Sequence, residues 1–300
     1  MAARLDCMQL TGVLVPMITP FDASGAVALP ALERLAHEVL EAGAAGLVGL
    51  GTTGEPSSLT PGEQQAVLAV LSRVATAHHV PLLAGGPVSA PPRGAVSASV
   101  GSAVSAPADA GLSVVPPFVR PGPDGVVAHF TALSETSPVP LVIYHVPART
   151  GQVLDAGTLR RIGSLDRVIG IKYATGSLDP DAVALLADPP PGFAILAGDD
   201  ALLSPMLALG AAGGITASAH LATDRFAALA AAWQTGDLDT ARKLGHLLAP
   251  LSAALFAEPN PSVIKAVLHA QGRIPTPSVR LPLLPATPES RARAVSLLPD

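Results

Sequence analysis

Residues 167–176 read Arg-Val-Ile-Gly-Ile-Lys-Tyr-Ala-Thr-Gly, an apolar, β-branched run that ends in a lysine. Such a run is typical of a buried strand in a parallel sheet. Lysine is rare in this chain: besides Lys172 it has Lys243 and Lys265, which lie among helix-forming residues where we expect a solvent-exposed face. An ammonium group at the end of a buried strand is poorly hydrated, so a fraction should be the free, nucleophilic amine. Lys172 is therefore a candidate for Schiff-base chemistry, and the alternative is a strand-end lysine that pairs with a carboxylate or reaches solvent.

A second apolar strand is predicted upstream, in residues 140–147, and it contains Tyr144. If the two strands are parallel neighbours, Tyr144 and Lys172 share one end of a sheet. A tyrosine there could transfer protons. The alternative is an amphipathic core residue whose hydroxyl group bonds to the backbone, and the sequence of this strand alone leaves both open.

Composition excludes several classes of protein. The chain has 300 residues, 49% hydrophobic and 14% charged, with a net charge of -5 that argues against a nucleic-acid or anionic-membrane partner. The single cysteine, Cys7, excludes an intramolecular disulfide framework, and the amino terminus lacks a signal-peptide pattern, so we expect a cytoplasmic location. The longest uncharged run, residues 201–223, is interrupted by proline and glycine, which favours helix, turn and buried strand over a membrane span.

Apolar runs alternate with alanine-rich helical stretches along the whole chain, which is the pattern of βα units. The predicted strands are residues 13–18, 47–50, 81–84, 112–115, 141–144, 168–172, 194–197 and 213–216. The predicted helices are residues 29–41, 61–78, 90–106, 125–135, 155–161, 180–186, 201–209, 224–234, 238–251 and 261–269.

Eight such repeats predict an α/β fold, a closed (β/α)8 TIM barrel with extra carboxyl-terminal helices. We expect a barrel catalytic domain over residues 1–222 and a helical extension over residues 223–300. A doubly wound open sheet is the rival fold, but it needs a glycine-rich phosphate turn after the first strand, and residues 13–21 have none. In a barrel, the carboxyl ends of the strands carry the active site, and both Lys172 and Tyr144 fall there.

The loop after the second predicted strand, residues 51–55, reads Gly-Thr-Thr-Gly-Glu. Glycines around two threonines can present backbone N–H groups and hydroxyls to a small anion such as a carboxylate, although an ordinary tight turn has the same composition. Thr60 is the expected cap of the next helix, with Pro61 in its first turn. His78 and His79 precede the third strand, at the opposite end of the barrel, where we expect no metal site.

Three motifs in this order and spacing resemble those of a known family. They are residues 51–55, residues 144–150 (Tyr-His-Val-Pro-Ala-Arg-Thr) and residues 170–176 (Gly-Ile-Lys-Tyr-Ala-Thr-Gly). The chain resembles the dihydrodipicolinate synthase and N-acetylneuraminate lyase family of class I, Schiff-base aldolases over residues 12–284. Residues 258–261 (Glu-Pro-Asn-Pro) and 280–282 (Arg-Leu-Pro) look more like the synthase branch.

The resemblance implies a pyruvate-dependent aldolase or synthase without a separate cofactor or metal. Lys172 would form an imine with the keto carbon of pyruvate, and Tyr144 and Thr52 would complete the catalytic set. Thr53 would hold the pyruvate carboxylate together with Thr52, and Arg149 would bind a carboxylate on the aldehyde. Gly198 would keep the pocket open, and the backbone carbonyl of Ile215 would lie over that pocket. Gly51 is the remaining implied substrate-binding residue. Residues 198–200, Gly-Asp-Asp, would include either a helix cap or supporting carboxylates.

The sequence departs from the synthase branch after the fourth predicted strand. That branch carries a tyrosine pair there, whose second member reaches the neighbouring subunit and completes a proton relay with the threonine and Tyr144. Here Pro117 and Phe118 take those places, so the relay is broken or bridged by water. His145, where asparagine is common, and Tyr173, where an acid is common, are expected to reshape the mouth of the pocket.

Three functions follow from these features. The leading one is condensation of pyruvate with an aldehyde. The alternatives are a retro-aldolase or dehydratase of a 2-oxo acid, such as 4-hydroxy-2-oxoglutarate or a keto-deoxy sugar acid, and a non-catalytic barrel that senses a 2-oxo acid. The resemblance also implies a homotetramer.

Overall fold

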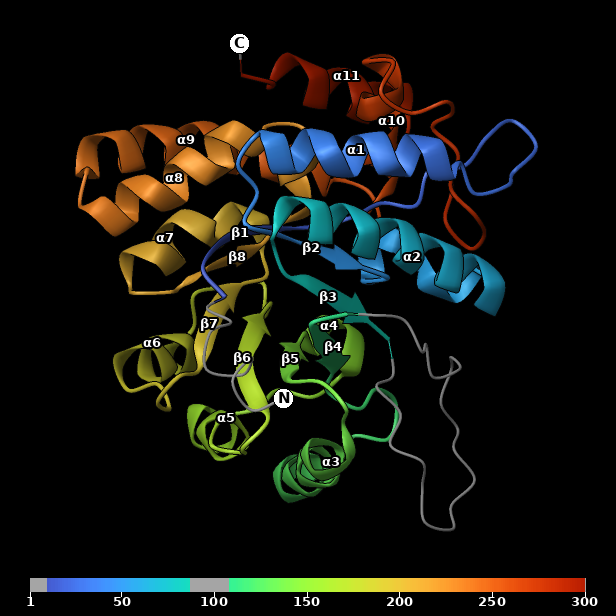
Figure 1. The fold of residues 1–300 in the computed structure, drawn as a ribbon. Helices are drawn as coiled ribbons and strands as arrows, with labels where there is room; N and C mark the ends of the chain where they lie inside the picture. The colour runs from blue at the N-terminus through green and yellow to red at the C-terminus, as the bar shows by residue number, and fades with distance from the viewer. Residues whose placement is uncertain (1–9, 87–107, 300) are drawn as a thin grey trace.

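The structure, a computed structural model, describes residues 10–86 and 108–299, and its strands form a closed parallel barrel in sequential order (Figure 1). The strands are β1 (Gly12–Pro16), β2 (Gly46–Gly49), β3 (Leu82–Gly85), β4 (Ala110–Val114), β5 (Leu141–His145), β6 (Val168–Tyr173), β7 (Ala194–Ala197) and β8 (Gly213–Ile215). Residue Leu14 of β1 pairs with Gly46 of β2 on one side and with Ile215 of β8 on the other, which closes the ring. The predicted (β/α)8 barrel is therefore confirmed.

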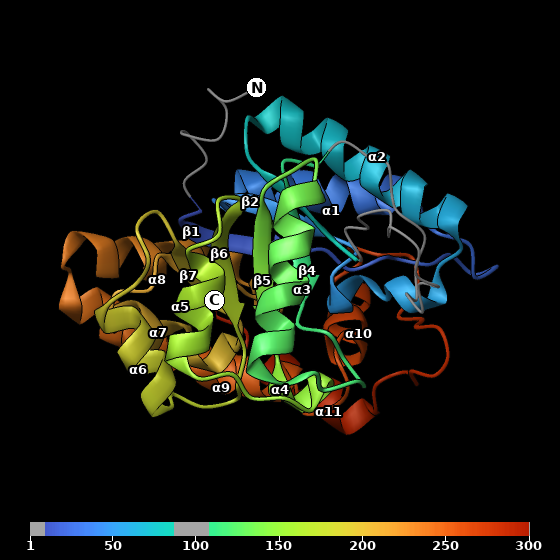
Figure 2. The same ribbon diagram turned by 90° about the horizontal axis from the view of Figure 1, so that it is seen from below.

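Helices surround the barrel on its outside, as the second view makes plain (Figure 2). They are α1 (Leu29–Glu41), α2 (Pro61–His78), α3 (Gly122–Thr136), α4 (Pro147–Thr150), α5 (Ala156–Gly163), α6 (Pro180–Ala187), α7 (Leu203–Ala208), α8 (Thr223–Thr235), α9 (Leu238–Leu255), α10 (Ser262–Ala270) and α11 (Pro288–Ser296). Single 3-10 turns occur at η2 (Thr52–Gly54), η3 (Pro56–Ser58), η4 (Asp200–Leu202) and η5 (Ala217–His220). The helix predicted at 90–106 lies outside the described residues, and α4 and α11 were not predicted.

The start of α2 agrees with the sequence prediction. The Thr60 side chain accepts a hydrogen bond from the backbone N–H of Glu63, and the Glu63 carboxylate accepts one from the backbone N–H of Thr60. This reciprocal capping box, with Pro61 at the first helical position, satisfies N–H groups that have no partner within the helix. It fixes where the chain turns from the loop after β2 into the helix.

The apolar residues form two layers, one inside the barrel and one between the strands and the helices. Along β5, Val142 and Tyr144 belong to the inner layer, whereas Ile143 belongs to the outer one. The strands are thus buried on both faces, which explains why their sequences read as continuous apolar runs. Residues from α8, α9 and α10, such as Phe226, Leu251 and Val267, extend the outer layer.

Strand β7 has its predicted bounds, whereas most other strand ends differ by one or two residues from their predicted positions, because burial continues beyond strand pairing. Met17 and Ile18 were predicted to continue the first strand; they are buried, yet β1 ends at Pro16. Conversely, β4 begins two residues earlier than predicted, at Ala110, because Ala and Gly give a weak strand signal. Within the described ranges, no helix is both long enough and apolar enough to cross a bilayer.

Candidate active site

Lys172 and Tyr144 lie side by side at the carboxyl ends of β6 and β5. They are direct partners in the parallel register, and the Lys172 ammonium nitrogen lies 4.6 Å from the centroid of the Tyr144 ring. Lys172 is buried, with 8% of its surface exposed. The prediction that these residues share one end of the sheet is therefore confirmed. An amine and a phenol this close can exchange protons with one bound molecule.

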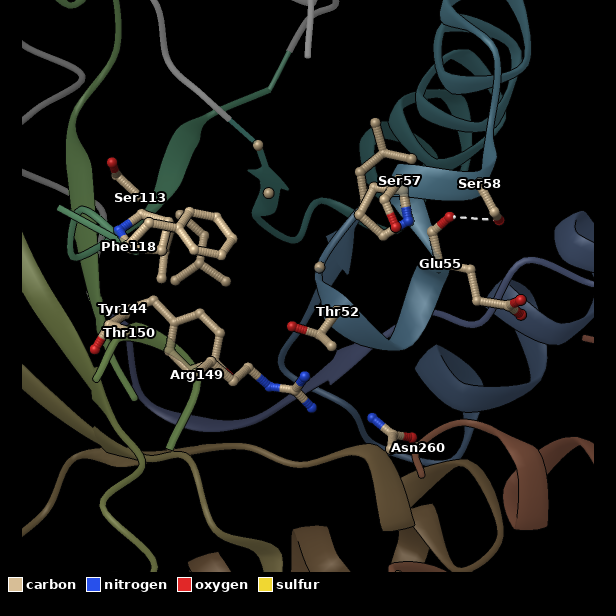
Figure 3. Close-up of a pocket in the computed structure, with 18 of the residues that line it drawn as sticks. Thr52, Glu55, Ser57, Ser58, Ser113, Phe118, Tyr144, Arg149, Thr150 and Asn260 are labelled. Carbon is tan, nitrogen blue, oxygen red and sulfur yellow. Dashed lines mark hydrogen bonds between the residues drawn. The ribbon is translucent and has the colours of Figure 1, made fainter. Parts of the chain in front are cut away.

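A cleft of about 730 Å³ opens beside this pair, at the mouth of the barrel. Thr52, Tyr144 and Arg149 all line it, and Figure 3 shows Arg149 reaching from the β5 side toward Thr52 and Asn260. Its wall also includes residues from β4, from the loop after β4 and from the carboxyl-terminal segment, among them Ser113, Pro117, Phe118, Asn260, Arg280, Leu281 and Leu283. The cleft therefore combines apolar walls with two arginines, a phenol and hydroxyl groups, as small-molecule sites do.

Four predicted site residues are not among those that line the cleft: Lys172, Thr53, Gly198 and Ile215. Lys172 lies behind the face of the Tyr144 ring, which does line it. The Thr53 hydroxyl accepts a hydrogen bond of 2.9 Å from the Asn260 side chain. Ile215 belongs to the apolar layer inside the barrel.

Gly198 leaves room for the lysine. A methyl group at this position would lie 2.9 Å from Cγ of Lys172 and 2.7 Å from Cβ of Ala174. Both distances are too short for carbon atoms in contact, so any side chain would displace the lysine stem or the end of β6. Gly51 is different: it lines the cleft, and a methyl group there would make ordinary contacts, 3.7 Å from Val48 Cγ1.

Two carboxylates tie together the loops that follow β6, β7 and β8. Asp199 accepts a hydrogen bond from the backbone N–H of Gly176, and Asp200 accepts one from the backbone N–H of Ser218. Burial raises the pKa of Asp200 to about 6 and also raises that of Asp199, while the Lys172 charge opposes both shifts. Of the two roles that the sequence left open, support is the one observed.

Glu55 and Lys265 form a buried ion pair beneath the loop after β2. The expectation that Lys265 lies on a solvent-exposed face is wrong: its side chain has no exposed surface, and its ammonium group bonds to the Glu55 carboxylate and to the Ser278 carbonyl oxygen, at 2.9 Å for the latter. The nitrogen also lies 4.1 Å from the centroid of the Phe21 ring. Burial lowers the pKa of Lys265 to about 8 despite the opposing Glu55 charge. Lys243, by contrast, is exposed as expected.

His145 and Tyr173 do not line the cleft, contrary to expectation. Successive residues of a strand face opposite sides, so the inward direction of Tyr144 and Lys172 turns their neighbours outward. The two rings lie 5.5 Å apart between barrel and helices, and the Tyr173 hydroxyl donates a 2.7 Å hydrogen bond to Asp179. Burial lowers the pKa of His145 to about 4 and raises that of Tyr173. This pair supports the strands from behind.

Asn260 is a cleft residue that the sequence analysis did not assign to the site. It belongs to the Glu-Pro-Asn-Pro segment, and its side chain links the carboxyl-terminal region to Thr53 in the loop after β2. The signal in the sequence is this motif itself, residues 258–261. A contact between residues 207 positions apart leaves no local pattern in the sequence.

A (β/α)8 barrel with a buried lysine beside a tyrosine, at the carboxyl ends of adjacent strands, defines the class of lysine-dependent barrel lyases. The model of the dihydrodipicolinate synthetase family matches residues 9–299, and the chain belongs to this family, whose members are pyruvate-dependent enzymes of the class I aldolase type.

Individual relatives agree. The chain is 39% identical to a 4-hydroxy-tetrahydrodipicolinate synthase from Synechococcus elongatus, over 96% of this chain and 95% of the relative. It superposes on the 4-hydroxy-tetrahydrodipicolinate synthase of Methylacidiphilum fumariolicum with a TM-score of 0.87 and 30% identity, covering 97% and 95% of the two chains. A dihydrodipicolinate synthase from Acinetobacter baumannii, solved in complex with pyruvate, matches with a TM-score of 0.86 and 32% identity, covering 97% and 98%.

Proposed function

We propose that Lys172 forms an imine with pyruvate and that the enzyme then joins this pyruvate to an aldehyde. The free amine attacks the keto carbon, water leaves, and the protonated imine accepts the electrons released when a methyl proton is lost. The resulting enamine attacks the aldehyde carbon, and hydrolysis of the new imine releases the product and the lysine. The observation that carries this proposal is the buried Lys172 ammonium beside Tyr144, which lines the cleft. No cofactor is needed beyond the lysine itself.

We infer roles for the other residues from their places around the cleft. Tyr144 would carry protons to and from the imine, because it both lines the cleft and lies against Lys172. Thr52 would bind the pyruvate carboxylate together with the loop of Gly51 and Thr53. Thr53 would act through its hydrogen bond with Asn260, which holds that loop in place.

The second substrate is proposed to carry a carboxylate. Arg149 is the cleft arginine suited to bind it, because a planar guanidinium can make two parallel hydrogen bonds to a carboxylate, whereas the guanidinium of Arg280 is already paired with Glu63. Gly198 would leave space beside Lys172, and the Ile215 carbonyl would lie over the pyruvate. Aspartate semialdehyde meets the requirement, and the relatives named 4-hydroxy-tetrahydrodipicolinate synthase favour it over other aldehydes. We therefore propose 4-hydroxy-tetrahydrodipicolinate synthase activity for this chain, and we propose that it acts in the cytoplasm.

The experiment is to reduce the pyruvate-treated protein with borohydride and to measure its intact mass, with peptide mapping. We expect one reduced adduct, on Lys172, in the unaltered chain. Lys172→Ala should give none, whereas Lys243→Ala, which removes an exposed lysine, should keep it. An adduct formed equally in Lys172→Ala, or none in the folded unaltered chain, would contradict the proposal and favour a barrel that only binds a 2-oxo acid.

An aldehyde screen then separates the two enzymatic alternatives. Consumption of pyruvate with aspartate semialdehyde, followed by ring closure, is the expected result. Release of pyruvate from 4-hydroxy-2-oxoglutarate or a keto-deoxy sugar acid, without condensation of aspartate semialdehyde, would instead identify a retro-aldolase.

A further inference from the structure

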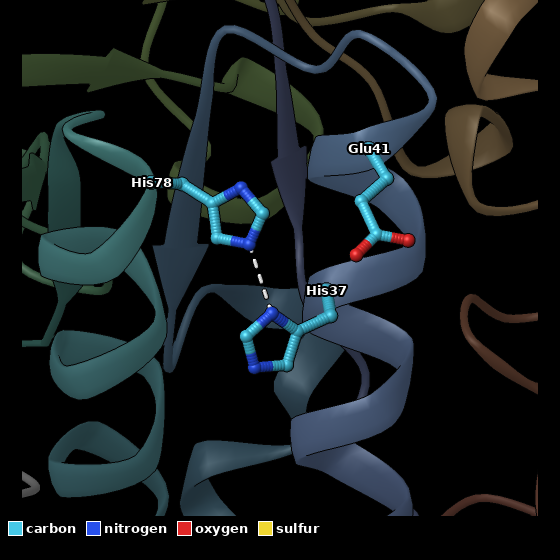
Figure 4. A group of neighbouring side chains, drawn as sticks. All are labelled: His37, Glu41 and His78. Carbon is cyan, nitrogen blue, oxygen red and sulfur yellow. Dashed lines mark hydrogen bonds between the residues drawn. The ribbon is translucent and has the colours of Figure 1, made fainter.

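A cluster of three metal-binding side chains lies on the outside of the barrel, away from the cleft. His37 and Glu41 come from α1, four positions apart and so on one face of that helix, and His78 is the last residue of α2. Figure 4 shows the two imidazoles and the carboxylate facing one another between the helices. One ligand atom from each residue lies within 4.8 Å of the others. Its position next to the starts of β2 and β3 separates it from the Lys172 end of the barrel.

The two imidazoles are already hydrogen-bonded to each other, so one of the facing nitrogens carries a lone pair and the other a hydrogen that a metal ion would displace. Nδ1 of His37 and Nε2 of His78 are 2.8 Å apart, so one of these nitrogens donates a hydrogen and the other accepts it. An unprotonated imidazole nitrogen is the form that binds a metal ion. At tetrahedral angles, with bonds of about 2.0 Å, two ligand nitrogens lie about 3.3 Å apart, so the pair needs to open by only about 0.5 Å.

The helix ends add a field that favours a cation. Glu41 and His78 are the last residues of α1 and α2, where unpaired carbonyl groups give a helix its partial negative charge. The two helices are also held together elsewhere, by an ion pair of 2.8 Å between Glu33 and Arg73. The ligands therefore stand on packed helices rather than on a loop.

We propose that His37, Glu41 and His78 bind a divalent late first-row transition-metal ion, with Zn²⁺ as the best fit. Two imidazoles and one carboxylate suit Zn²⁺, whereas Mg²⁺ and Ca²⁺ require oxygen ligands. Glu41 is exposed, so solvent can supply the fourth ligand. The bound ion links α1 to α2. This proposal departs from the sequence-based expectation of no metal site at His78, because the other two ligands come from α1.

Calorimetric titration of the metal-free full chain with Zn²⁺ tests the proposal. We expect binding of one equivalent, weakened at least about tenfold in His37→Ala, His78→Ala and Glu41→Gln, since even outer-shell changes cost that much. Glu41→Gln keeps the shape of an exposed side chain, so it tests the site without threatening the fold. His246→Ala removes an exposed histidine on α9 and should bind like the unaltered chain.

Thermal unfolding gives a second readout. An ion that binds only the native pair of helices raises the Tm, and this rise should disappear in Glu41→Gln while persisting in His246→Ala. Mg²⁺ at the same concentration should have no such effect. Zn²⁺ affinity in the three cluster variants equal to that of the unaltered chain, or no stoichiometric binding by the unaltered chain, would overturn the proposal.

Discussion

Phe118 lies at the rim of the cleft, and its phenyl ring has no group that can act as an acid or a base. Its side chain is 88% exposed, and its backbone adopts φ +67°, a conformation that non-glycine residues rarely take. Strain of this kind persists where the surroundings impose it, often at functional sites. A phenyl ring can fill space there, but it cannot transfer a proton.

A Phe118→Tyr substitution should therefore raise turnover with aspartate semialdehyde by about tenfold or more, because a placed general acid contributes on that scale. Steady-state kinetics at saturating pyruvate measure the change. Phe256→Tyr, at another exposed phenylalanine away from the cleft, is the control and should have no effect. Equal rates for both variants would mean that water already replaces the missing hydroxyl.

His220 makes the stability of the chain sensitive to acid. It is fully buried, its Nε2 accepts a hydrogen bond from the Ile18 backbone N–H, and its Nδ1 bonds to the Ala217 carbonyl. This arrangement requires the neutral ring, and burial lowers the pKa of His220 from 6.5 to about 4. Between these values the unfolded chain binds more protons than the folded one, so stability falls as pH decreases.

The free energy of unfolding should thus fall by about 3 kcal/mol through this group as pH decreases from about 6.5 to about 4. Urea unfolding measured at several pH values across that range should show that, in His220→Gln, the free energy of unfolding falls with acid by about 3 kcal/mol less than in the unaltered chain. His246→Gln, which replaces an exposed histidine, should keep the full pH dependence of the free energy of unfolding. If the pH dependence of the free energy of unfolding is unchanged in His220→Gln, the acid sensitivity belongs to other groups.

At the scale of elements, the buried Glu55 and Lys265 pair joins the loop after β2 to α10. A second bond reinforces the link, because the other oxygen of Glu55 accepts a 2.8 Å hydrogen bond from the Arg280 backbone N–H. Two charges removed from water stabilise a fold only while each has its partner. The loop that carries Thr52 and Thr53 is therefore held from below by the carboxyl-terminal region.

Glu55→Gln should destabilise the fold by about 3–5 kcal/mol, because it leaves the buried Lys265 ammonium without its partner. The double variant Glu55→Gln with Lys265→Met should recover much of that loss, since the buried charge is gone. Glu33→Gln, which breaks an exposed ion pair with Arg73, should cost less than about 1 kcal/mol. Urea unfolding compares the variants, and a small loss in Glu55→Gln would contradict the argument.

Local patterns predicted these elements better than they predicted contacts between distant ones. The βα order, the cap at Thr60 and the pairing of Tyr144 with Lys172 follow from strand periodicity and parallel pairing. The burial of Lys265 could not be predicted, because the helix-forming residues around it are compatible with an exposed side chain and its partner Glu55 lies 210 positions away. The place of Asn260 in the site was not predicted for the same reason, because its partner Thr53 is also distant in the sequence.

At the scale of the whole molecule, the rim of the cleft exposes apolar side chains that suit contact with another copy of the chain. Phe118 is 88% exposed, and Val119 beside it is 74% exposed. Grouped apolar residues on a surface usually mark an interface. We propose that they pack against a neighbouring subunit within a homotetramer.

Sedimentation velocity over a dilution series at micromolar concentration should accordingly give a tetramer. Val119→Glu should shift the distribution toward smaller species, because a carboxylate in an apolar interface costs free energy unless it is paired. A monomer across the series would remove any role for Phe118 beyond its own cleft.

The cleft draws on both halves of the chain, and this has a consequence for synthesis. Barrel closure needs β8 beside β1, and the wall of the cleft also needs Asn260 and Leu283. A nascent chain on the ribosome therefore has no complete substrate site until residue 283 has emerged. We expect truncated chains that end before residue 283 to lack activity, because pyruvate has no complete site on a partly made barrel.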